Sequence, residues 1–77
     1  MTCVRTPITT EDGATVFEGD RVYDYYSMKA GVIVDCSIIH APDVWFDVLH
    51  DDGTKTVLNG QRICTMAFAR SRGWPGA

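Results

Sequence analysis

Apolar and polar residues alternate through the middle of this chain, which is the pattern of β-strands with one buried face. In VWFDVLH (44–50), Phe46 and Val48 share one face, whereas Trp45 and Asp47 share the other. The alternation predicts that Phe46 and Val48 are buried in a core and that Trp45 is at least partly exposed.

Turn-forming residues divide the middle of the chain into short segments. The run VIVDCSII (32–39) is rich in β-branched residues and follows an expected loop at 27–30. Asp52-Gly53 has the composition of a hairpin turn and separates the strands VWFDVLH and KTVL. We expect one helical turn in QRIC (61–64), leading into a last short strand.

Two flanking regions complete the chain. In the N-terminal arm (1–17), PITT and TVF surround a turn at 11–14, which predicts a hairpin. In the C-terminal tail (66–77), MAFARSRGWPGA predicts about two helical turns, because Gly73 and Pro75 would end a longer helix.

The spacing of strands and turns over 18–65 predicts an all-β domain, a small five-stranded antiparallel barrel. Closure of the barrel would remove the exposed strand edges that a flat sheet of this size leaves. We expect its interior to contain Val22, Val34, Phe46, Val48, Leu58 and Ile63.

Composition and charge narrow the function. The 77 residues are 45% hydrophobic, enough for one packed core, and no apolar run has the length of a membrane span. The N-terminus lacks the apolar block of a signal peptide, so we expect a cytoplasmic protein. The net charge is −3, but the stretch from Glu11 to Asp52 holds all ten acidic residues and only two basic ones. This acidity disfavours binding to nucleic acid through phosphate contacts.

Candidate chemistry is sparse. Three cysteines without close pairs are a poor disulfide framework. The usual close ligand pairs of a zinc site are missing among the four candidates, Cys36, His40, His50 and Cys64. Asp51 and Asp52 have the position of turn residues. No nucleophile stands at a recognisable spacing from a histidine, so we expect no enzyme, no metal and no cofactor.

Four segments between Glu18 and Thr65 resemble the Src-homology-3-like small barrel of the Tudor or KOW kind: GDRVYDYY, GVIVD, WFDVLHDDGT and a closing RI. The chain is also similar in style to short proteins of bacterial viruses. Barrels of this shape bind peptides, methylated side chains, nucleic acid or partner subunits. The Tudor likeness implies an outward-facing aromatic cage with an anionic partner, for which the candidates are Tyr23, Tyr25, Tyr26 and Trp45, with Asp24 or Asp47.

The sequence is compatible with three functions. The first is a non-enzymatic binding module that presents these aromatic and acidic residues to a protein partner with basic residues, or to a second copy of itself. The second is a nucleic-acid-associated barrel that stacks bases on its aromatics and contacts phosphates through Lys55, Arg62, Arg70 and Arg72. The third is an accessory protein of a virus in the host cytoplasm, either structural or inhibiting a host protein through its acidic surface.

Overall fold

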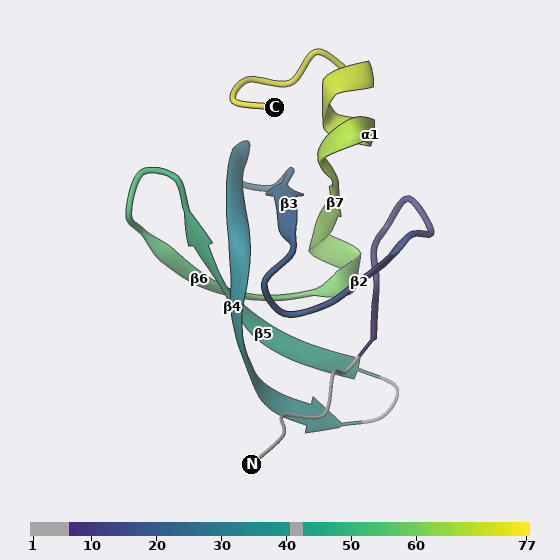
Figure 1. Ribbon diagram of the computed structural model, residues 1–77, viewed down its shortest axis with the longest axis vertical. Coiled ribbons are helices and arrows are strands. Elements are labelled where there is room, and N and C mark those ends of the chain that lie inside the picture. The colour runs from purple at the N-terminus through teal and green to yellow at the C-terminus, as the bar shows by residue number, and fades with distance from the viewer. Residues whose placement is uncertain (1–6, 41–42) are drawn as a thin grey trace.

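The computed structural model describes the backbone of residues 7–40 and 43–77, together with the side chains of these ranges other than 36–40, 43 and 44. The described chain is mostly β-structure with one short C-terminal helix (Figure 1). No helix in this part of the chain is both long and apolar enough to cross a membrane. In chain order the elements are β1 (Ile8–Thr9), β2 (Thr15–Val16), β3 (Arg21–Asp24), β4 (Lys29–His40), β5 (Asp43–His50), β6 (Lys55–Asn59), the 3₁₀-helix η1 (Gly60–Arg62), β7 (Ile63–Thr65) and α1 (Met66–Ser71).

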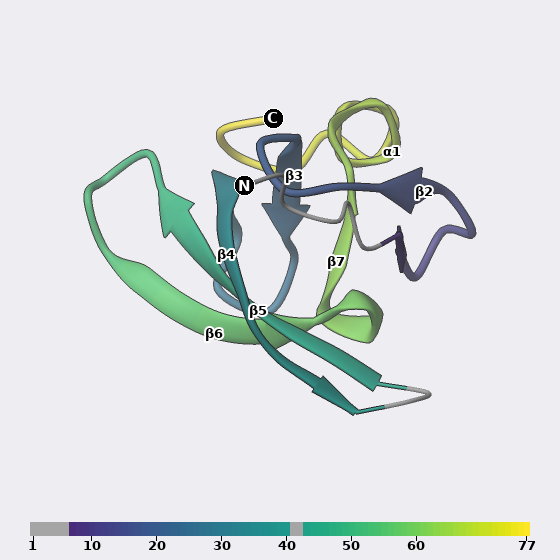
Figure 2. The same cartoon turned by 60° about the horizontal axis from the view of Figure 1, so that its bottom comes forward.

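Five strands form one curled antiparallel sheet in the order β6-β5-β4-β3-β7. β4 pairs with β3 through its first residues and with β5 along most of its length. Figure 2 shows how β4, β5 and β6 curve, so that the sheet wraps around an interior. The hydrogen-bonded order ends at β6 and β7, which are joined through η1 and are the two edges of the sheet.

The interior of the curled sheet is filled by apolar side chains: Ile8, Val16, Val22, Ile33, Phe46, Val48, Leu58 and Ile63. Five of the six residues expected there are confirmed. The prediction for Val34 is wrong, because Ile33 is buried in its place and Val34 is only half-buried. Gly31 pairs with the inward-facing Val22, and Ile33 pairs with the inward-facing Val48, so alternation along β4 turns Val34 to the outer face. A run of consecutive β-branched residues does not reveal which of its positions face inward.

The turn between β3 and β4 differs from the expected one. The loop predicted at 27–30 is a tight turn at 25–28, and β4 begins directly after it. The Asp24 carboxylate accepts hydrogen bonds from the backbone N–H of Tyr26 at 3.0 Å and from the Ser27 hydroxyl at 2.6 Å. This side-chain cap fixes the turn early, so that strand pairing starts before the glycine at 31.

The N-terminal hairpin is part of the packed structure. β1 and β2 pair as the expected two-stranded sheet, and each contributes one buried side chain to the interior. The Glu11 N–H donates to the Ile63 carbonyl oxygen at 2.9 Å, so the hairpin lies against β7. Gly60 permits this close approach, because a Cβ on it would collide with the carbonyl oxygen of Thr9.

A second buried cluster lies on the opposite face of β3 and β7. α1 and the C-terminal tail cover this face, and the fully buried members are Tyr23, Ala30, Cys64 and Ala69. Thr65 caps the start of the helix, because its hydroxyl accepts a hydrogen bond from the Phe68 N–H at 3.1 Å. Gly73 follows the helix with a φ of 71°, a conformation that favours glycine. The short helical tail predicted from the sequence is confirmed.

Candidate functional site: a pocket lined by aromatic rings

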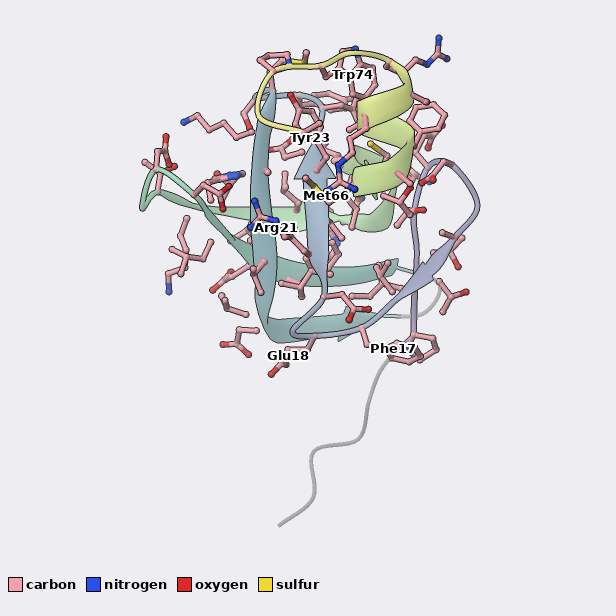
Figure 3. All side chains as sticks on the ribbon, turned by 45° about the horizontal axis from the view of Figure 1, so that its top comes forward. Phe17, Glu18, Arg21, Tyr23, Met66 and Trp74 are labelled. Carbon is pink, nitrogen blue, oxygen red and sulfur yellow. The ribbon has the colours of Figure 1, made fainter. Side chains whose placement is uncertain are left out.

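Four aromatic side chains pack together beside α1. The Trp74 ring stacks on Tyr23, with ring centroids 5.6 Å apart, and on Tyr25 at 5.9 Å. Phe68 meets the same indole edge-on at 5.9 Å. Figure 3 shows Tyr23 and Trp74 together at the end of the molecule opposite Glu18. One tryptophan therefore covers two tyrosines, Tyr23 from β3 and Tyr25 from the turn that follows it.

The two tyrosine hydroxyls anchor these rings to the backbone. Tyr23 donates to the Pro75 carbonyl oxygen at 2.5 Å, and Tyr25 donates to that of Gln61. Burial raises the pKa of both phenols, so both remain neutral donors at physiological pH. The rings are therefore held by the tail on one side and by η1 on the other.

A pocket of about 470 Å³ opens beside the rings, a volume within the range of small-ligand sites. Its walls come from three parts of the chain: the turn of the N-terminal hairpin, the residues around β3 and β7, and the C-terminal helix and tail. The lining residues are Glu11, Asp12, Tyr25, Cys64, Phe68, Arg72 and Trp74. We call this site the ring pocket.

Asp12 fixes one wall of the ring pocket. Its carboxylate accepts hydrogen bonds from the Thr65 hydroxyl at 2.8 Å, the Thr65 N–H at 3.2 Å and the Thr10 hydroxyl at 2.5 Å. Burial opposes ionisation of Asp12, but these hydrogen bonds outweigh it and hold the pKa of the carboxyl below its ordinary value. The carboxylate is therefore charged at neutral pH and ties the N-terminal turn to the start of α1.

The Glu11 side chain differs from that of Asp12. It is exposed where it lines the ring pocket, and no cation pairs with it among the residues that the structure describes. Burial, followed by the charge of Glu11, raises the pKa of Tyr25. The pocket thus has an unpaired negative charge beside its ring faces.

Two arginines lie over rings at this end of the molecule. The Arg72 guanidinium carbon is 5.1 Å from the Phe68 ring centroid, and that of Arg62 is 4.6 Å from the Tyr26 ring centroid. Tyr26 is 63% exposed and packs at a tilt against Tyr25. The ring faces here already receive cations from within the chain.

Cys64 lines the ring pocket as a buried, apolar thiol. Burial, followed by the charge of Asp12, raises its pKa to about 11, so the thiol is neutral at physiological pH. No three side chains able to hold a metal come together in the described part of the chain, and the side chains of Cys36 and His40 lie outside it. His50, the remaining metal candidate, is buried.

The structure divides the residues that were expected to form one aromatic face. Tyr25 lines the ring pocket, and Tyr26 is exposed next to it. The accessible position expected for Tyr23 is wrong: the residue does alternate away from the interior, but α1 and the tail cover it and leave it 0% exposed. Asp24, at 1% exposed, is likewise not a surface residue, because its carboxylate caps the β3–β4 turn.

Trp45 and Asp47 belong to a different surface. Both alternate away from the interior on β5, and Trp45 is half-buried, as the sequence predicts. The ring contacts of the described residues do not connect Trp45 with the cluster around Trp74. The outer face of β5 and the ring pocket are therefore separate surfaces.

Much of the acidic stretch is used within the fold. Asp51 forms a two-bond ion pair with Arg21, at 2.9 and 2.5 Å, and Asp52 pairs with Lys29 at 2.8 Å. Asp52 also accepts a hydrogen bond from the Thr54 N–H at 3.0 Å, which confirms its role in the turn. These contacts lower the pKa of both carboxyls, with the hydrogen bond from the basic side chain as the largest cause.

The basic candidates are also separated. Arg62 and Arg72 lie at the rings, and Arg70 is exposed on α1. Lys55 follows the β5–β6 turn, which lies on the opposite side of β3 and β4 from α1 (Figure 1).

Sequence reasoning missed four residues of the pocket: Glu11, Asp12, Phe68 and Trp74. One signal was available, because Phe68 and Trp74 are large aromatic side chains in a short tail, and such side chains are highly buried on average. Comparisons of the chain with protein-family models, curated proteins and solved structures found no match. The function is therefore inferred from the geometry of the site.

Proposed function

We propose that this chain is a non-enzymatic binding module with a Src-homology-3-like fold, and that its ring pocket receives a cationic side chain of a protein partner. Support for the fold comes from five antiparallel strands in one curled sheet, with a single helical turn before the last strand. Folds of this kind host many activities, so the function has to come from the site.

The observation that carries the proposal is the unpaired Glu11 carboxylate at a pocket walled by three aromatic rings. The face of an aromatic ring attracts a weakly hydrated cation, and a carboxylate beside it supplies the full opposite charge. Two carboxylates and one guanidinium line the pocket, so its fixed charge is negative. An arginine or lysine side chain matches both features.

Calorimetric titration with two unstructured peptides tests this. One peptide carries arginine and lysine in a glycine-serine background, and the other replaces these residues with glutamate. We expect binding of the basic peptide only. Glu11→Gln removes the charge and keeps the shape, and it should weaken binding by about tenfold, which corresponds to 1.4 kcal/mol.

The matched control is Glu18→Gln, which removes the same charge from an exposed side chain at the opposite end of the molecule (Figure 3). It should leave the affinity unchanged. Equal losses in the two variants would show that the peptide responds to the overall acidity and not to the pocket, which would contradict the proposal.

A second candidate function is binding of single-stranded nucleic acid. The specific observation in its favour is the position of Arg62 over the exposed ring of Tyr26, since arginine and aromatic faces together accept stacked bases. Oligothymidylate distinguishes the two functions. Binding of this probe that falls steeply with added salt and is lost in Arg62→Gln would favour nucleic acid over a basic protein.

A further inference from the structure

We propose that the free edge of β6 pairs antiparallel with β6 of a second copy of this chain, with Thr56 of the two copies at the twofold axis. The two curled sheets would then join into one continuous sheet. This surface is separate from the ring pocket, so the inference goes beyond the function proposed above.

The two edges of the sheet differ in how they are covered. The N-terminal hairpin lies against β7, as the hydrogen bond from Glu11 to Ile63 shows. Within the part of the chain that the structure describes, β6 pairs with β5 alone, and its first three residues, 55–57, are all exposed. An uncovered edge strand presents backbone donors and acceptors that can pair with another strand.

The backbone hydrogen bonds between β5 and β6 show which N–H and C=O groups of β6 point away from β5. The His50 N–H donates to the Thr54 carbonyl oxygen at 2.8 Å. Along two antiparallel strands, residue pairs that exchange backbone hydrogen bonds alternate with pairs that do not. Thr56 is two residues from Thr54, so it also directs its backbone N–H and C=O groups toward β5. Lys55 and Val57 consequently direct their N–H and C=O groups to the free edge.

An apolar patch follows this edge on the outer face of the sheet. Val57 is 53% exposed and Leu49 is 41% exposed, and both are large hydrophobic residues. They share a face, because Val57 stands opposite Asp47 and Leu49 is two residues further along β5. Pairing of β6 with a second copy would bring the two patches together.

Charges on the same face are unbalanced within one copy. Asp35 and Asp47 stand directly opposite each other across β4 and β5, an arrangement that is unfavourable for like charges. Neither carboxylate has an ion pair among the described residues, and neither does Lys55. The chain thus leaves two carboxylates and one ammonium group on this face without opposite charges in contact.

The register of the proposed pair satisfies these charges. With Thr56 at the axis, Lys55 of each copy stands opposite Val57 of the other, and Val57 is the neighbour of Asp47. A lysine can lie along an apolar side chain and extend its charged end beyond it. Each Lys55 then covers the partner's Val57 and reaches the partner's Asp47. Centring the pair on Val57 would instead place Lys55 opposite Asn59, so the charges select the first register.

Sedimentation velocity over a range of protein concentrations tests this pairing. We expect the wild-type chain to shift from monomer to dimer as its concentration rises. Lys55→Glu would place a third carboxylate near Asp35 and Asp47 and should weaken the dimer by at least about tenfold, because facing like charges are strongly unfavourable at an interface. Asp47→Lys should weaken it similarly.

The double variant Lys55→Glu/Asp47→Lys restores opposite charges and should recover the dimer. The control Arg70→Glu reverses a charge on α1, away from β6, and should leave the dimer unchanged. A wild-type chain that remains monomeric at about 1 mM would overturn the proposal. So would a double variant that associates no better than the single ones, provided that circular dichroism shows each variant to be folded.

Discussion

The two faces of β3 are packed in different ways. Val22 faces the interior, where every member of the cluster is aliphatic apart from Phe46, and the neighbours come from paired strands. Tyr23 faces the opposite side, where rings with hydroxyl groups pack against α1 and the tail. The interior cluster is held mainly by apolar burial, whereas the ring side also depends on directed hydrogen bonds from its tyrosine hydroxyls.

The hydrogen bonds on the ring side join distant parts of the chain. The hydrogen bond from Tyr23 to Pro75 joins residues 52 positions apart, and that from Thr65 to Asp12 joins residues 53 positions apart. Contacts of this kind hold a pocket in shape, but each is also a single polar link that one substitution removes. We therefore expect the interior to determine whether the chain folds and the ring side to determine what it binds.

The largest effect should come from the interior. Phe46 is fully buried, and Phe46→Ala should lower the free energy of unfolding by about 3–5 kcal/mol, because it leaves a cavity that neighbours only partly fill. Urea titration followed by circular dichroism measures this. Phe46→Leu, which keeps most of the volume, should cost much less. A loss below about 1 kcal/mol in Phe46→Ala would contradict the assigned interior.

On the ring side, Trp74→Ala should lower the free energy of unfolding less than Phe46→Ala does, and it should weaken peptide binding more. The indole is half-buried and contacts three rings, so we expect a loss of about 1–3 kcal/mol with the sheet still formed. Binding of the basic peptide should fall below detection in calorimetry. Trp45→Ala is the matched control and should keep the binding. The reverse result would place the site on the outer face of β5, where the sequence first indicated it.

The smallest effect is the pH dependence that Asp12 contributes. Its pKa in the folded chain lies below the value of 3.8 for a free aspartate, so its stabilising effect is complete above that pH and is lost as pH falls through the lower, folded value. Asp12→Asn should therefore be less stable than the wild type at pH 6, and this difference should shrink below about pH 4. Thermal unfolding at both pH values tests this. Equal stability at pH 6 would show that the Thr65 contacts contribute nothing.

Local pattern was sufficient for the strands and for most of the interior. The alternation around Phe46 predicts β5 and its faces, and Asp52-Gly53 predicts the turn that follows. These features depend on neighbours in sequence or across one hairpin, which is the range over which side-chain periodicity carries information. Val34 marks the limit, because a run of consecutive β-branched residues does not show which of its positions face the interior.

Tertiary structure alone decided the candidate site. The sequence by itself determined that Tyr23 points away from Val22, since successive residues of a strand face opposite ways. It did not determine that a helix and tail from the other end of the chain would cover Tyr23, or that the turn at Glu11 would complete a pocket with Trp74. Periodicity reports on which side of a strand a residue lies. What packs against that side depends on how distant segments close around the sheet, and no local pattern encodes that closure.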